Sequence, residues 1–227
     1  MGGGGFSMEP DNLALDRYIL AASGVANPKV CFIGTASGDS QIYIDKFYTA
    51  FRTLPCEPAH LVLFQPTIAD IPAFLLEQNV IYVGGGSTRN LLVLWREWRL
   101  DQILRDAWQS GVVLAGISAG SLCWFEEGVS DSVRANELEP IRCLGFLPGS
   151  HCPHYDGEPN RRPAYHRFIA EQKLGPGYAA DDGAALHFTG TELTRVVSSR
   201  PTAKAYRVRW TGTEVEETQL PTQLLAS

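Results

Sequence analysis

The stretch Val112-Val113-Leu114-Ala115-Gly116-Ile117-Ser118-Ala119-Gly120 decides the fold of this chain. Its first four residues form a continuous apolar run, which is typical of a strand buried on both faces of a sheet. Two glycines flank Ser118, and residues 121–125 can form a helix. A serine on such a tight strand-to-helix turn, a nucleophile elbow, needs small neighbours because larger side chains would clash. We therefore predict a buried strand, a sharp turn that lifts the Ser118 hydroxyl above the sheet, and a helix.

The same alternation of strand and helix precedes this stretch. Apolar runs predict strands at 30–34, 61–64 and 80–83, and the spacing of apolar residues predicts helices within 13–22, 39–51, 68–78, 87–95 and 100–108. This alternation indicates an α/β fold in which helices cover a mostly parallel sheet. After residue 178, short strands at 184–188, 194–197 and 205–208 predict an antiparallel meander at one edge of the sheet.

Length and composition narrow the class of protein. The chain has 227 residues, which fits a single domain over residues 1–227. Hydrophobic residues make up 44% and charged residues 19%, as in a globular protein with a substantial core. No apolar run is long enough to cross a membrane, and a formal charge of -6 disfavours nucleic-acid binding. Five cysteines without a Cys-x-x-Cys pair fit reduced thiols in a cytoplasmic protein.

Ser118 is a candidate nucleophile. The turn would place its hydroxyl at the positive end of a helix and aim the amide of Ala119 at a developing oxyanion; the alternative is a glycine-rich turn with a capping serine. A catalytic serine needs a base, and His154 lies in a loop rich in proline and glycine, where catalytic residues are common. His151, His154 and Asp156 would also suit half of a metal site, but no third ligand follows at a useful spacing.

The acid that would orient the base stays open at this point. The acidic candidates lie in predicted loops: Asp131, Glu158, Asp181 and Asp182. Residues 84–86 are three glycines that end a strand at the same edge of the sheet as Ser118. Glycines there let a ligand approach the backbone and offer amides to an oxyanion. A phosphate loop is the alternative, but the lysine and hydroxyl residue that complete that motif are missing.

Several blocks, taken in order, resemble peptidase family S51, the group of peptidase E (aspartyl dipeptidase) and cyanophycinase. The blocks are residues 83–88 with 90–92, then 116–120, 130–132, 153–156 and 182–183, and the resemblance covers nearly the whole chain. It implies a flavodoxin-like three-layer sandwich, similar to class I glutamine amidotransferases, with a C-terminal antiparallel edge. It also implies a serine peptidase that hydrolyses small peptides, dipeptides or acidic peptides with an N-terminal aspartate, without a metal or organic cofactor.

The resemblance assigns roles position by position. Ser118 matches the family's nucleophile and His154 matches its base. Asp131 matches one acidic position of the family pattern and Asp182 matches the other, with Asp131 slightly favoured. The resemblance therefore places both carboxylates near the site and leaves the third member of the relay unsettled.

The same resemblance implies an oxyanion hole and a site for the substrate carboxylate. Gly85 or Gly86 would form the oxyanion hole together with Ala119. Arg161 and Arg162 follow the histidine loop, and an arginine fork suits a carboxylate, so they are candidate substrate-binding residues; the alternative is that both face solvent.

The chain departs from the family pattern in two places. A strand usually precedes the glycine-rich segment, whereas this chain begins at the glycines, so either its start is assigned too late or the sheet lacks a strand. Burial of such a strand would stabilise the fold by several kcal/mol. Residues 153–167 are closer to an uncharacterised subgroup of the family than to the dipeptidases proper, which leaves the exact substrate open.

Two other functions stay open as well. An α/β-hydrolase esterase would use the late His187 as its base, although Asp181 and Asp182 stand too close before it to be the usual acid. A homologue without catalytic activity would bind a peptide or metabolite. The expected partner is a small peptide substrate rather than nucleic acid or a membrane, and the sequence does not decide between a monomer and a homodimer.

Overall fold

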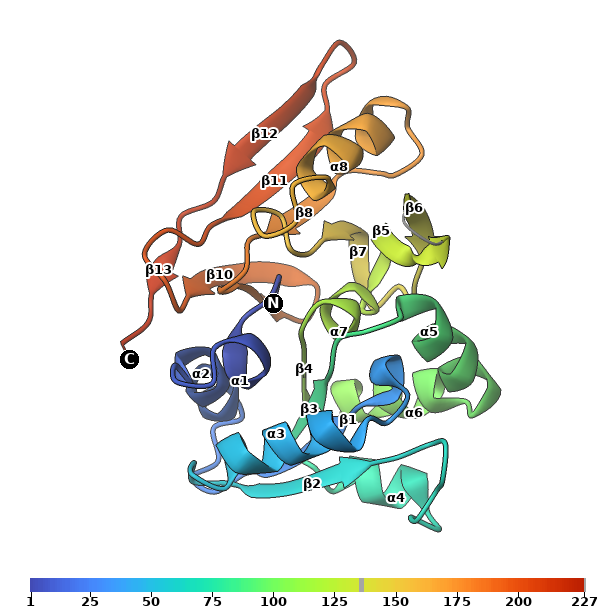
Figure 1. Cartoon of the computed structure of the whole chain (residues 1–227), viewed down its shortest axis with the longest axis vertical. Helices are drawn as coiled ribbons and strands as arrows, with labels where there is room; N and C mark the ends of the chain where they lie inside the picture. Colours follow the sequence, from blue (N-terminus) through green and yellow to red (C-terminus); the bar gives the residue numbers. More distant parts are fainter. Residues whose placement is uncertain (135–136, 227) are drawn as a thin grey trace.

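A computed structural model of the chain, which describes residues 1–134 and 137–226, contains a parallel sheet at one end and a mixed sheet at the other (Figure 1). The first sheet has four strands in the order β2-β1-β3-β4, all parallel. They are β1 (Lys29–Ile33), β2 (Glu57–Leu61), β3 (Val80–Val83) and β4 (Val113–Gly116). The helical segments around it are α1 (Gly5–Met8), α2 (Ala14–Ala22), η1 (Thr35–Ser37), α3 (Gln41–Phe51), α4 (Ile71–Leu76), α5 (Thr88–Glu97) and α6 (Leu100–Gln109).

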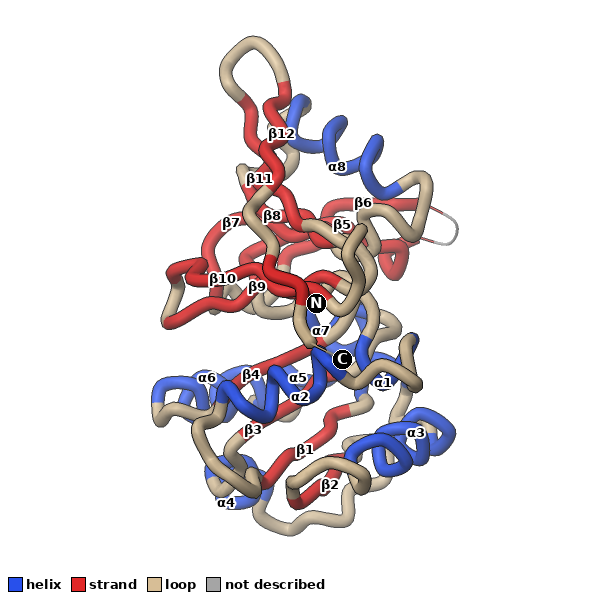
Figure 2. The backbone as a smooth tube through the Cα atoms, turned by 90° about the vertical axis from the view of Figure 1, so that its left-hand side faces the viewer, coloured by secondary structure: helices blue, strands red, loops and turns tan. Residues whose placement is uncertain are grey.

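Alternate side chains of β1 enter two separate cores, because successive residues of a strand point to opposite faces. Val30 and Phe32 pack in one hydrophobic cluster with residues of α2 and α3. Cys31 and Ile33 pack in another cluster with residues of α4, α5 and α6. Figure 2 shows α3 and α4 on opposite sides of this sheet. Strands β1 and β3 are therefore buried on both faces, as predicted. Strand β4, for which the same burial was predicted, lies at the edge of the sheet, and its residues 113–115 are only partly buried.

The second sheet has six strands in the order β12-β11-β8-β7-β5-β6. Its parallel centre consists of β5 (Phe125–Arg134), β7 (Leu147–Cys152) and β8 (Gly177–Ala180), and the antiparallel members are β6 (Glu137–Arg142), β11 (Ala205–Trp210) and β12 (Val215–Gln219). Helix α7 (Ala119–Leu122) connects β4 to β5, and α8 (Arg161–Ala170) packs on this sheet. A third sheet, of three strands, consists of β9 (Ala184–Thr189), β10 (Glu192–Ser198) and β13 (Gln223–Leu224).

The chain thus has a mixed α/β fold with a mostly parallel central sheet, as predicted, and it is compatible with a flavodoxin-like architecture. Three expectations need correction. Strand β2 covers residues 57–61 rather than 61–64, because an edge strand accepts Pro58, while the amides of Leu63 and Phe64 donate to Asp39. The C-terminal strands do not extend the four-stranded sheet but pair in the two other sheets. The helix expected over residues 121–125 ends at Leu122.

In the part of the chain that the structure describes, every helix is too short or too polar to cross the hydrocarbon layer of a membrane.

Candidate active site

Ser118 lies on the turn between β4 and α7, in a backbone conformation that a serine rarely adopts. Its φ is 55° and its ψ is -117°, a sparsely populated region in which non-glycine residues cluster at functional sites. The flanking glycines are required by packing, since a Cβ on Gly116 would overlap the carbonyl oxygen of Gly120 and a Cβ on Gly120 would overlap that of Val83. A tight turn therefore connects β4 to α7, and the serine on it is partly exposed.

Of the three glycines after β3, Gly85 lies against Ser118. A Cβ on Gly85 would be 3.2 Å from the Cβ of Ser118. Gly86 has a φ of 136°, and a Cβ there would overlap the carbonyl oxygen of Ala36, so only glycine fits. Within residues 1–134 and 137–226, the amides of Gly86 and Ala119 meet no hydrogen-bond acceptor, whereas the amide of Gly85 donates to the hydroxyl of Tyr43. The amide that follows Ser118 and the amide that follows Gly85 are thus both unengaged.

His154 contacts the carboxylate of Asp182. The two atoms, Nδ1 of His154 and Oδ1 of Asp182, are 2.6 Å apart, and the side chains are only 13% and 18% exposed. Since Nδ1–H donates to the carboxylate, Nε2 is the nitrogen left to accept a proton. His154 has a φ of 54°, so the strained backbone positions include this candidate base as well as Ser118.

The adjacency of β7 and β8 explains this pairing. His154 follows the end of β7 and Asp182 follows the end of β8, and the two strands are parallel neighbours. The carboxyl ends of parallel neighbours meet at one edge of a sheet, so the two side chains face each other there. The amide of Tyr155 donates to the carbonyl of Ala180 at 3.1 Å and ties the histidine loop to β8.

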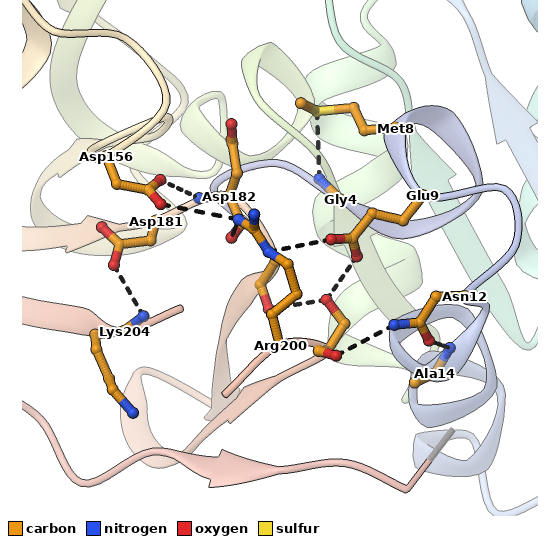
Figure 3. A network of polar contacts seen from close by, with 12 residues as sticks. Gly4, Met8, Glu9, Asn12, Ala14, Asp156, Asp181, Asp182, Arg200 and Lys204 are labelled. Carbon is orange, nitrogen blue, oxygen red and sulfur yellow. Dashed lines mark hydrogen bonds and ion pairs between the residues drawn. The ribbon is translucent and has the colours of Figure 1, made fainter. Parts of the chain in front are cut away.

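Asp182 is further held through its own backbone, as Figure 3 shows. Its amide donates to Oδ1 of Asp156 at 2.8 Å, and the guanidinium of Arg200 donates to its carbonyl oxygen. Arg200 also pairs with Glu9 at 3.2 Å. Arg200 and Glu9 could not be predicted from the sequence, because they lie far from Asp182 along the chain and carry no motif.

Residues 1–3 link the serine to the acid. The amide of Ser118 donates to the carbonyl of Met1 at 3.3 Å, and the amide of Gly183 donates to the carbonyl of Gly3 at 3.1 Å. Gly3 also forms an isolated parallel β-bridge with Asp182. Two residue steps span at most about 8 Å. Residues 1–3 therefore contact the backbone of Ser118, on the first sheet, and that of Asp182 and Gly183, on the second, although no hydrogen bond joins Ser118 to His154 among the described residues.

Asp131 and Glu158 contact Arg161 rather than a histidine. Asp131 is 62% exposed and lies 3.7 Å from the guanidinium of Arg161, and Glu158 binds the same guanidinium at 2.7 Å. The structure therefore places Asp182, and not the slightly favoured Asp131, on His154. Asp181 is buried and accepts from the amide of Lys204 at 2.9 Å.

Both of the predicted substrate-binding arginines already have carboxylate partners. Arg161 is buried and also donates to the carbonyl of Val129 at 3.0 Å. Arg162 is half-exposed and pairs with Glu217. Each guanidinium is already neutralised by a carboxylate, so neither is presented to a ligand as an unpaired cation.

The remaining histidines considered above have structural partners. His151 is buried, bonds to Ser121 at 2.9 Å and to the carbonyl of Tyr178 at 3.1 Å, and burial lowers its pKa to about 3. His187 bonds to the hydroxyl of Tyr18 at 2.6 Å, and burial lowers its pKa as well. Both rings are neutral near pH 7. Both ring nitrogens of His151 are therefore engaged and leave none for a metal site with His154. His187, the base of the esterase alternative, is bound to the phenol of Tyr18.

Comparison with known proteins agrees with this architecture. The model of peptidase family S51 matches residues 1–196. The uncharacterized peptidase YgaJ of Bacillus subtilis is 62% identical over 225 residues, which are 99% of this chain and 97% of that protein. A peptidase E of Shewanella amazonensis is 28% identical over 135 residues, 56% of this chain and 57% of that protein. The crystal structure of a peptidase from an acI-B1 actinobacterium has the same fold, with a TM-score of 0.72 at 21% identity over 98% of this chain and 92% of that one.

These matches show the class of protein: it is a peptidase, a hydrolase that acts on peptides. Within that class, the chain belongs to peptidase family S51.

Proposed function

We propose that the chain is a serine peptidase in which Ser118 is the nucleophile, His154 is the base and Asp182 orients the base. The observation that carries this proposal is the 2.6 Å contact between His154 and Asp182, at the sheet edge that residues 1–3 connect to Ser118. The strained backbone at Ser118 and His154 adds support, because such strain persists where function requires it.

The reaction would follow the relay common to serine hydrolases. Nε2 of His154 takes the proton of the Ser118 hydroxyl while Oγ attacks the scissile carbonyl. The unengaged amides of Gly86 and Ala119 are the candidate donors to the tetrahedral oxyanion, and one such donor is worth roughly 3–4 kcal/mol. The imidazolium then gives its proton to the leaving amine, and water releases the acyl group by the same steps.

The substrate class we propose is a small peptide, with dipeptides and N-terminal aspartate the first to be tested. The carboxylate of an acidic substrate would need a cation. Because Arg161 and Arg162 are both ion-paired, the assignment of either one to that carboxylate requires its present partner to be displaced. An unblocked neutral dipeptide therefore belongs in the same panel as an aspartyl dipeptide.

Hydrolysis of a dipeptide panel by the unmodified chain and by Ser118→Ala tests the proposal. The panel contains Asp-Leu, Asn-Leu, Glu-Leu, Ala-Leu and N-acetyl-Asp-Leu. We expect turnover by Ser118→Ala to fall by about 1,000-fold or more, with an unchanged circular dichroism spectrum. Ser121→Ala is the matched control, since Ser121 lies in α7, the helix that follows Ser118, and bonds to His151 instead. Activity retained by Ser118→Ala would overturn the assignment.

A further inference from the structure

Tyr43 contacts the glycine loop beside the nucleophile from another element. Its hydroxyl accepts the amide hydrogen of Gly85 at 3.3 Å, across 42 residues of sequence. The neighbouring amide of Gly84 donates to the carbonyl of Ile33 at 3.0 Å. Tyr43 is thus the side chain that holds the peptide group directly before the unengaged amide of Gly86.

The ring of Tyr43 is itself held in place. Its Cε1 lies 2.9 Å from where a Cβ on Gly84 would be, so the ring packs directly on the loop backbone. Its centroid lies 5.0 Å from that of Phe32 and 5.7 Å from that of Phe6. Burial raises the pKa of the hydroxyl, so it stays protonated near pH 7. The hydroxyl therefore has a fixed position.

The opposite end of the loop is fixed by backbone contacts. The amide of Ser87 donates to the carbonyl of Ala36 at 2.8 Å, and Gly86 packs on the same carbonyl. Between these ends, consecutive glycines leave the backbone free to rotate. The Tyr43 hydroxyl restricts that rotation at Gly85, and thereby the direction in which the next amide points.

We propose that Tyr43 is a positioning residue for the oxyanion hole: it orients the Gly84–Gly86 loop so that the amide of Gly86 faces the carbonyl attacked by Ser118. The proposal rests on the serine mechanism proposed above. Tyr43 acts through Gly85 and is not assigned any contact with the substrate, so its loss should weaken stabilisation of the transition state and leave ground-state binding nearly unchanged.

Tyr43→Phe tests this, because it removes only the hydroxyl. Tyr48→Phe is the matched control: it lies in the same helix, and its hydroxyl bonds to His60 at 2.8 Å. We expect Tyr43→Phe to lower kcat on Asp-Leu at least about tenfold while KM changes less than about twofold. Tyr48→Phe should leave both constants unchanged. Hydrogen exchange of the Gly85 amide, followed by NMR, should become at least about tenfold faster only in Tyr43→Phe.

The two readouts separate this inference from the proposed function. If Ser118→Ala keeps its activity, the serine mechanism fails and the role of Tyr43 fails with it. If Ser118 is essential but Tyr43→Phe keeps an unchanged kcat, the positioning role is overturned while the serine mechanism stands. If the unmodified chain does not hydrolyse Asp-Leu, Gly85 exchange decides: unchanged exchange in Tyr43→Phe overturns the contact on which the inference rests, and faster exchange supports it.

Discussion

The position of Asp182 depends on two glycines far apart in the sequence. A Cβ on Gly3 or on Gly157 would overlap the carboxylate of Asp182. The carboxylate therefore fits between two backbone segments with no room for side chains, and its remaining open side faces Nδ1 of His154. Such confinement fixes the imidazole in one tautomer, which is the task of the acid in a serine relay.

Replacement of this carboxylate by an amide should impair catalysis far more than the same change at Asp131. We expect Asp182→Asn to lower kcat roughly 1,000- to 10,000-fold, because an amide does not stabilise the imidazolium and favours the wrong tautomer. Asp131→Asn, at an exposed residue paired with Arg161, serves as the control and should stay close to the unmodified chain. Steady-state kinetics on one dipeptide would measure both. A larger loss in Asp131→Asn would make Asp131 the acid of the relay.

Some residues of the candidate site could be predicted from the sequence, and others could not. Ser118 and His154 could be nominated because each stands in a local context, a tight turn or a proline-rich loop, that sequence spacing reveals. The choice between Asp131 and Asp182 could not be made, since it depends on β8 being the neighbour of β7. Tyr43 carried no signal for the same reason: its partner is a backbone amide 42 residues away.

At the scale of elements, a carboxyl group is buried between α2 and Tyr82 of β3. Asp16 of α2 is fully buried, and neither of its oxygens has a hydrogen-bond partner of normal geometry among the residues described. The groups that face it are the hydroxyls of Tyr82 and Tyr43 and the carboxylate of Glu9. Burial is the main reason that the pKa of Asp16 is raised from 3.8 to about 7.

This raised pKa makes stability depend on pH in a definite direction. Between pH 4 and pH 7 the unfolded chain releases the Asp16 proton while the folded chain keeps it. The free energy of unfolding should therefore fall with rising pH, by up to about 1.4 kcal/mol per pH unit from this group, and level off above about pH 7. Asp16→Asn should remove that decline. Urea unfolding of both proteins from pH 4.5 to 8 would measure it, and parallel curves would contradict the assignment.

Helices and strands differ in how well the sequence predicts them. Strand β3 and helices α5 and α6 were predicted nearly to the residue, because a continuous apolar run or a helical stripe marks each. Strands β5 and β6 mix buried and exposed residues, so no hydrophobic pattern marks them in the sequence. Their extended conformation depends on hydrogen bonds to each other and, for β5, to β7. These two strands could not be delineated from the sequence. The C-terminal strands were therefore expected at the edge of the parallel sheet, whereas they pair in the two other sheets.

At the scale of the whole molecule, the candidate site lies where the two larger sheets meet (Figure 1). The first sheet contributes Ser118 and the glycine loop, and the second contributes His154 and Asp182. Residues 1–3 contact both sides. Catalysis by this arrangement requires both sheets to be docked, which is why no single stretch of sequence contains the site.

The central claim is that His154 activates Ser118, and covalent labelling tests it most directly. The unmodified chain, shown to hydrolyse a dipeptide, would be treated with a fluorophosphonate at pH 7 and the adduct mapped by peptide mass spectrometry, with His154→Ala in parallel. The account predicts an adduct on Ser118 that forms at least about 100-fold more slowly in His154→Ala. An active preparation with no adduct on Ser118, or equally fast labelling in His154→Ala, would contradict it.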